Sequence, residues 1–130
     1  MPLARIDLNK RASPELVRTV CDAVYNAMVE IANVPLHDRF QIVTRHGDDE
    51  ILYPPEGYLG VRYSSDVIII QITWVAGRSI EVKQKFYHRI VDEIHDKQRV
   101  RKEDVVIVLV DNAREDWSFG NGVMQYAPKG

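Results

Sequence analysis

The two halves of this chain repeat each other, without a gap, at a constant offset of 66 residues. Similar residues recur at this offset along a strand, a helix start, a helix face and the approach to a second strand. The matched pairs include Ile6 with Ile72, Ser13 with Ser79, Glu15 with Glu81, Leu16 with Val82, Val20 with Phe86, Val24 with Ile90, and Asp38 with Asp104. A register kept over so many elements indicates a duplicated structural unit and restricts the chain to folds with internal pseudo-symmetry.

Each unit has the pattern of a strand, a helix and a second strand. In the first unit, Ser13 suits a helix N-cap, Pro14 suits the first helical position, and Pro35 ends the helix. Ser79 has the place of Ser13 in the second unit, and apolar residues at helical spacing follow both serines. We expect strands at 3–8, 39–44, 67–74 and 105–110, and helices that begin after residues 13 and 79.

We therefore predict one domain over residues 1–130, with βαβ repeats at about 2–44 and 67–110, a polar connection at 45–66 and a loop-like tail at 111–130. The connection contains one further expected edge strand, at 51–53. Because βαβ crossovers are right-handed, the two strands of each unit should be parallel. The predicted fold class is α+β, or α/β by its local units: a duplicated βαβ fold with a four-stranded mixed sheet and two helices on one face.

Two strands of this predicted sheet are apolar at consecutive positions, at 67–70 and 105–110. That pattern is typical of strands buried on both faces, whereas two helices cover only one face of a four-stranded sheet. The second face needs a cover that a single chain does not supply. We therefore expect a symmetric homo-oligomer whose sheets face one another across the subunit interface.

Composition excludes several classes of function. The formal net charge of −2 and the pI near 6.1 predict neither nucleic-acid binding nor attraction to an anionic membrane. The single cysteine, Cys21, excludes an internal disulfide and a cysteine-based zinc site, and the four histidines have no metal-ligand spacing. Since no apolar run reaches the roughly 18 residues of a membrane span, we expect no membrane partner and a cytoplasmic location.

Three residues with useful chemistry are expected at one edge of the sheet. Pro2 opens the first strand and becomes the chain terminus if Met1 is removed; its amine could then act as a general base or, protonated, as a general acid. If the two units pair antiparallel, Asp38 and Arg78 fall at the same edge as Pro2. Arg78 also precedes a helix N-terminus, which attracts anions. The repeat-mates, expected at the opposite edge, are Ile68, Asp104 and Ala12.

Four stretches of sequence carry a family resemblance. They are Met1-Pro2 at the start of a strand, residues 34–41 (VPLHDRFQ), residues 71–79 (QITWVAGRS) and residues 116–122 (DWSFGNG). With them the chain resembles the tautomerase superfamily, and specifically its malonate semialdehyde decarboxylase-like branch, over nearly its whole length. The resemblance implies a homotrimer, no metal and no organic cofactor, and a terminal proline that acts on small oxo- or unsaturated carboxylic acids.

The resemblance also assigns residues, with one departure. Pro2 matches the catalytic proline, and Asp38 matches the aspartate that positions water or tunes the proline. Arg78 matches the second of two arginines that bind the substrate carboxylate, but the first is missing, because Val75 or Ala76 stands near its place. The residues that match the aromatic wall over the substrate are Trp117, Phe119 and Tyr126.

Three functions remain open on this basis. Protonated Pro2 could polarise a 3-oxo acid that loses carbon dioxide, or neutral Pro2 could move a proton between carbon and oxygen in a 2-oxo acid; the missing arginine favours the second reaction. The third is an interaction protein on the same scaffold, since a fold does not fix a function. Each residue also has a structural alternative: Asp38 could brace a turn, as we expect of Asp104, Arg78 could be solvated, and Trp117 with Phe119 could be ordinary packing.

Overall fold

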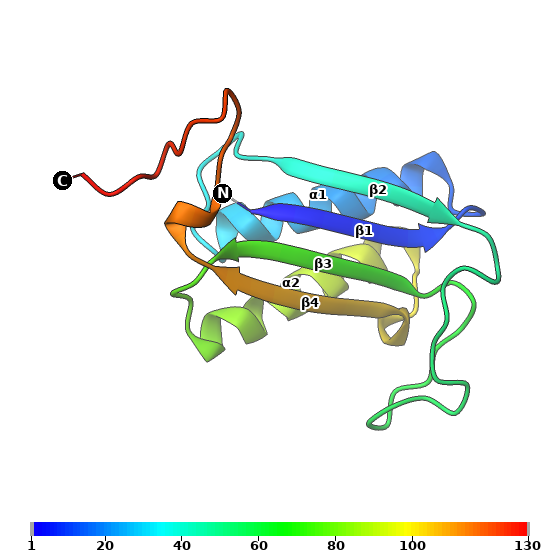
Figure 1. Ribbon diagram of the computed structural model, residues 1–130. Helices are drawn as coiled ribbons and strands as arrows, with labels where there is room; N and C mark the ends of the chain where they lie inside the picture. The colour runs from blue at the N-terminus through cyan, green and yellow to red at the C-terminus, as the bar shows by residue number, and fades with distance from the viewer. Residues whose placement is uncertain (1, 130) are drawn as a thin grey trace.

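A computed structural model describes residues 2–129, and Figure 1 shows a sheet with both long helices behind it. The strands are β1 (Leu3–Asn9), β2 (Phe40–His46), β3 (Ile68–Val75) and β4 (Val105–Asn112), and the helices are α1 (Pro14–Glu30) and α2 (Ile80–Gln98). Two short 3-10 helices, η1 (Lys102–Asp104) and η2 (Arg114–Asp116), flank β4. The predicted duplicated βαβ fold with both helices on one face is confirmed.

The sheet has the order β2-β1-β3-β4, with the two repeats joined through an antiparallel β1–β3 pair. Arg5 lies opposite Gln71 in this pair, and these two residues are separated by the repeat offset itself. The outer pairs are parallel and share one register, because Leu3 faces Phe40 in the first repeat as Ile69 faces Val106 in the second. The pseudo-two-fold axis therefore passes between Arg5 and Gln71.

Both helices begin as predicted. The Ser13 hydroxyl accepts a hydrogen bond from the Leu16 N–H at 3.0 Å, and the Ser79 hydroxyl accepts one from the Val82 N–H at 3.2 Å. Each serine so satisfies one of the N–H groups that a helix start leaves without a partner. The same side-chain chemistry at the same repeat position thus fixes where both helices start.

The core lies between the sheet and the helices. Alternate residues of the two central strands point into it and are almost completely buried, which gives these strands one helix-facing side. The fully buried large side chains include Ile6, Leu8, Ile68, Ile70, Ile72 and Trp74 from the strands and Val20, Val24, Phe86, Ile90 and Ile94 from the helices.

The other face of the sheet carries exposed apolar side chains. Ile42 of β2 is 40% exposed, and Val108 and Val110 of β4 are 45% and 37% exposed. These side chains are on the face opposite the helices, where the strand pattern calls for a cover. In the part of the chain that the structure describes, no helix is long and apolar enough to cross a membrane.

The predicted edge strand at 51–53 is wrong. These residues are all described, and they lie in the long connection between β2 and β3 without ladder pairing. Pro54 and Pro55 follow directly, and proline supplies no N–H for a ladder, so the extended pattern ends before it can pair. The other strands run one or two residues past their predicted ends, because backbone pairing continues through polar residues such as Arg45 and Asp111.

Candidate active site

Pro2, Asp38 and Arg78 lie at the same edge of the sheet, as the topology predicts. Pro2 directly precedes β1, whose first residue pairs with the first residue of β2 and with Thr73 near the end of β3. Asp38 comes two residues before β2, and Arg78 three residues after β3. In Figure 1 the chain start and these strand ends meet at the left side of the sheet. The pseudo-symmetric fold thus brings all three residues together from distant parts of the sequence.

Pro2 and Asp38 line one small hollow under this edge. Its walls also include Tyr25 and Met28 of α1 and Phe40 of β2. Pro2 is buried, and the hollow has a volume of about 10 Å³, room for one water molecule at most. An amine at Pro2 would therefore sit beside a carboxylate and apolar walls, and a substrate would reach it from outside the hollow.

Arg78 lies at the same edge but does not line this hollow, and other contacts fix its side chain. Its Nε–H donates to the carbonyl of Ala32 at 3.2 Å, and Nη1 donates to the carbonyl of Val75 at 3.0 Å. The guanidinium lies over the ring of Trp74, 4.2 Å from its centroid. Partial burial lowers the pKa of Arg78, while the charge of Asp111 opposes that shift. The guanidinium keeps its charge at neutral pH and has a defined orientation, with the rest of its donor fork left to bind an anion.

The three predicted wall residues form one aromatic cluster. Trp117 stacks on Phe119 with centroids 5.4 Å apart, and Tyr126 meets Phe119 edge-on at 5.3 Å. Phe119 also packs on Phe40 at 5.8 Å. The C-terminal tail leaves β4, which is one outer strand of the sheet, and Phe119 of this tail packs on Phe40 of β2, the other outer strand. The tail therefore crosses the edge of the sheet where Pro2 lies. The cluster therefore lies at the same edge of the sheet as Pro2, in contact with Phe40, which lines the hollow.

Comparison with known proteins identifies the family. A family model described as "Tautomerase enzyme" matches residues 38–120, which include Asp38, Arg78, Trp117 and Phe119. The probable tautomerase YusQ of Bacillus subtilis (strain 168) is 38% identical over 96% of this chain and 98% of its own length. The chain belongs to the tautomerase family.

Two solved structures of malonate semialdehyde decarboxylases are similar to this tautomerase-family chain. The FG41 enzyme, inhibited by 3-bromopropiolate, is 42% identical with a TM-score of 0.87, over 95% of this chain and 93% of that one. A second malonate semialdehyde decarboxylase is 31% identical with a TM-score of 0.85, over 95% of both chains. Its structures are of the wild-type, a mutant and the inactivated enzyme, and they are described as a basis for its decarboxylase and hydratase activities. The chain is thus similar to the decarboxylase-like branch that its motifs indicate.

Tyr25 is a residue of this edge that sequence reasoning did not single out. Its hydroxyl accepts a hydrogen bond from the His37 N–H at 2.9 Å, and the Arg39 guanidinium lies 4.9 Å from its ring centroid. His37 has a positive φ of 69°, a strained conformation for a non-glycine residue. Tyr25 therefore fixes the turn that carries Asp38 into the hollow. A tyrosine on an otherwise apolar helix face is the one signal in the sequence that points to it.

The variant Tyr25→Phe tests this role, because it removes the hydroxyl and keeps the ring. We expect a loss of no more than about 1 kcal/mol in the free energy of unfolding, since the exposed His37 N–H can bind water instead. We expect kcat/KM to fall about three- to tenfold as Asp38 loses its fixed position. Tyr58→Phe, at a tyrosine that is 64% exposed on the connection, is the matched control. Equal kinetics of the two variants would contradict the role of Tyr25.

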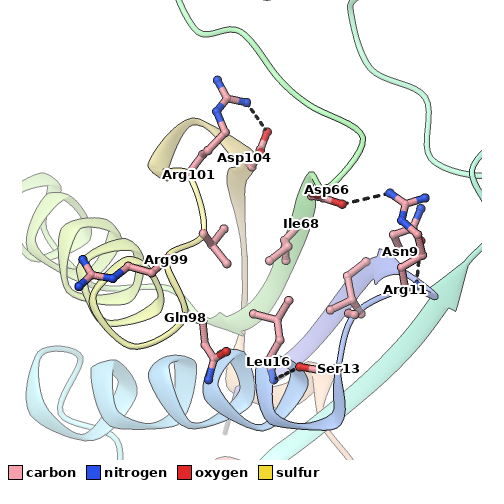
Figure 2. A pocket seen from close by; sticks show the side chains of 13 residues that line it. Asn9, Arg11, Ser13, Leu16, Asp66, Ile68, Gln98, Arg99, Arg101 and Asp104 are labelled. Carbon is pink, nitrogen blue, oxygen red and sulfur yellow. Dashed lines mark hydrogen bonds and ion pairs between the residues drawn. The ribbon is translucent and has the colours of Figure 1, made fainter.

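The opposite edge of the sheet has a larger cavity, which charged side chains line but which has no counterpart of Pro2. A cavity of about 430 Å³ lies there, and the repeat-mates Ala12, Ile68 and Asp104 line it (Figure 2). Asp104 is buried and accepts hydrogen bonds from the Ser64 N–H at 2.7 Å and the Ser64 hydroxyl at 2.5 Å, so it braces the end of the connection. Since Ile68 stands in the place of Pro2, this cavity lacks the amine. The larger cavity and Pro2 therefore lie at opposite edges of the sheet.

Within residues 2–129, no group of three or more His, Cys, Asp or Glu side chains is arranged to hold a metal ion. The groups that gather at the Pro2 edge are a carboxylate, a guanidinium and aromatic rings. Such groups suit proton transfer and the binding of an organic carboxylate.

Proposed function

We propose that the processed chain, which begins at Pro2, is an enzyme that acts on a small oxo-carboxylic acid without a cofactor. The observation that carries this proposal is the common edge itself: a buried Pro2 beside Asp38, with the oriented Arg78 and the aromatic cluster at the same edge. In this proposal Pro2 transfers the proton, Asp38 tunes or orients it, and Arg78 binds the carboxylate. The aromatic residues Trp117, Phe119 and Tyr126 bind the body of the substrate and exclude water.

Keto–enol tautomerisation of a 2-oxo acid is the reaction that we propose first. Neutral Pro2 removes a proton from the carbon next to the carbonyl group and, now protonated, delivers that proton to the carbonyl oxygen, which gives the enol and restores the neutral amine. The apolar walls around Pro2 disfavour its cation and so favour the neutral amine that works as a base. Binding one carboxylate needs only one arginine. This agrees with the chain, in which Arg78 is present and the other arginine of the family pair is missing.

Decarboxylation of a 3-oxo acid is the second candidate, and the similarity to a malonate semialdehyde decarboxylase at 42% identity favours it. In this reaction protonated Pro2 polarises the carbonyl oxygen, the bond to the carboxylate carbon breaks, and carbon dioxide leaves an enolate that is then protonated. The charge of Asp38 next to the amine favours the cation that this step needs. The two candidates therefore differ in the protonation state of Pro2.

The experiment begins with the mass of the purified protein, which tells whether Met1 has been removed. Retained methionine would acylate the amine and leave no catalytic base. The processed protein is then assayed for enol formation from phenylpyruvate by ultraviolet absorbance, and for release of carbon dioxide from malonate semialdehyde. Turnover of phenylpyruvate supports the first candidate and carbon dioxide release the second. A processed protein with neither activity, on these and on a panel of other oxo acids, would favour an interaction protein.

We also propose that the protein is a homotrimer in which the uncovered sheet faces are buried. Light scattering should give three chains of 15.0 kDa, or about 45 kDa. Val108→Glu, on the uncovered face, should shift the mass toward one chain, because a buried and unpaired carboxylate is costly. Leu52→Glu, at a residue that is 85% exposed on the connection, is the control and should keep the mass. A wild-type mass near 15 kDa would contradict the proposal.

A further inference from the structure

The Arg78 guanidinium rests on a tryptophan that the second repeat places at the end of β3. Trp74 is completely buried, and its ring packs against Phe86 of α2 with centroids 5.1 Å apart. The guanidinium lies on this ring at 4.2 Å. A cation over an indole is attracted by the negative face of the ring, more strongly where water is excluded. The orientation of the Trp74 ring therefore helps to set the orientation of Arg78.

Asp111 of β4 fixes the Trp74 ring in turn. The Nε1–H of Trp74 donates to Oδ1 of Asp111 at 2.8 Å, and Asp111 lies directly opposite Trp74 in the β3–β4 register. The other carboxylate oxygen, Oδ2, accepts a hydrogen bond from Lys83 Nζ at 3.1 Å. Hydrogen bonds from Lys83 and then from Trp74 lower the pKa of Asp111 below its ordinary value, so the group is ionised at neutral pH.

The first repeat shows that the fold does not require this arrangement. At the same register it pairs Leu8 with Arg45 in place of Trp74 with Asp111. There Arg45 donates to the carbonyl of Ala12, the repeat-mate of Arg78. The strands pair in the same register in both repeats, so this register does not depend on the tryptophan and the aspartate. The tryptophan, the aspartate and the arginine occur together only at the edge that also has Pro2.

We propose that Asp111 is a positioning residue that, through Trp74, holds the Arg78 guanidinium in the orientation that binds a substrate carboxylate. The proposal rests on the proposed function, in which Arg78 binds that carboxylate. Asp111 itself needs no contact with the substrate. Its effect is on the affinity for carboxylate-bearing substrates, while proton transfer at Pro2 is unchanged.

The kinetic test compares three variants with the wild-type chain on the oxo acid that the enzyme turns over. Asp111→Ala should raise KM about three- to tenfold; kcat should stay within about twofold for a substrate that is tautomerised and should rise together with KM for one that is decarboxylated. Asp111→Asn, which keeps an acceptor for the indole N–H, should restore KM to within about twofold of the wild type. Lys83→Gln removes the ion pair with Asp111 but leaves the hydrogen bond from the Trp74 indole, so its KM should also stay within about twofold of the wild type. An equal rise of KM in Asp111→Ala and Asp111→Asn would overturn the proposal.

A double-mutant cycle adds a result that a merely structural role would not give. In an Arg78→Ala background, Asp111→Ala should leave KM unchanged, because the residue through which Asp111 acts is gone. If the effects of the two substitutions multiplied instead, Asp111 would act independently of Arg78, and the proposal would be wrong.

A binding-independent measurement separates this proposal from the proposed function. The side-chain protons of Arg78, assigned by their loss in Arg78→Ala, should show a ring-current shift in the NMR spectrum because they lie over Trp74. Asp111→Ala should reduce this shift, whereas Asp111→Asn should keep it. If the chain turned over no oxo acid but this pattern held, the proposed function would fail while the positioning role remained. An unchanged shift in Asp111→Ala would overturn the positioning role even in an active enzyme.

Discussion

Pro2→Ala should lower the turnover of every oxo-carboxylic acid substrate by about 10²- to 10⁴-fold in kcat, the range that a positioned proton-transfer group contributes. Removal of Met1 from this variant still exposes an α-amino group, but a primary amine on an alanine lacks the ring that packs into the hollow with Tyr25 and Met28. The amine is then more mobile and better hydrated, so it loses its fixed position for proton transfer. Initial rates of the processed variant, with its start verified by mass, measure the effect.

Pro54→Ala is the matched control for this substitution. It makes the same chemical change at an exposed position of the connection, far from the Pro2 edge along the sheet, and should leave kcat and KM unchanged. Thermal unfolding of both variants checks that the fold is intact. A fully active Pro2→Ala protein would mean that the amine is not the catalyst, and the interaction-protein hypothesis would then replace the enzyme.

The fold followed from the sequence because local and long-range signals agree. Ser13 and Ser79 mark both helix starts, and the common offset between the repeats leads to the antiparallel arrangement in which Arg5 faces Gln71. A duplicated unit supplies each signal twice, so each repeat supports the interpretation of the other. The same reasoning placed Pro2, Asp38 and Arg78 at one edge before any side chain was located.

The details of the site were less predictable, for reasons that lie in side-chain geometry. Trp74 has the pattern of an ordinary core residue. The apolar pattern predicts that the last strand ends at residue 110, whereas β4 continues to Asn112, and the hydrogen bond from Trp74 to Asp111 depends on that continuation. Tyr25 is similarly hidden, because its role depends on which N–H group its hydroxyl meets. Residues 51–53 have an extended pattern without a partner strand, and a pattern cannot reveal that absence.

Arg78→Ala should raise KM for carboxylate substrates about tenfold to a hundredfold, because a charge-assisted hydrogen bond contributes about 1.5–3 kcal/mol. Arg78→Lys should recover part of this affinity, since it keeps the charge but loses the planar fork that bonds Ala32 and Val75. Arg11→Ala is the control, because this arginine lies at the opposite edge, where it pairs with Asp66. A KM of Arg78→Ala equal to that of the wild type would show that Arg78 does not bind the substrate.

The accompanying change in kcat distinguishes the two proposed reactions. In tautomerisation the carboxylate is a bystander that binds Arg78 equally in the ground state and the transition state, so Arg78→Ala should raise KM and leave kcat unchanged. In decarboxylation the negative charge moves from the departing carboxylate toward the carbonyl oxygen. An arginine that holds that carboxylate stabilises the ground state more than the transition state, so its loss should raise kcat together with KM. A kcat that falls steeply would contradict both, and would mean that Arg78 stabilises charge that develops only in the transition state, as an electrostatic catalyst and not as a carboxylate anchor.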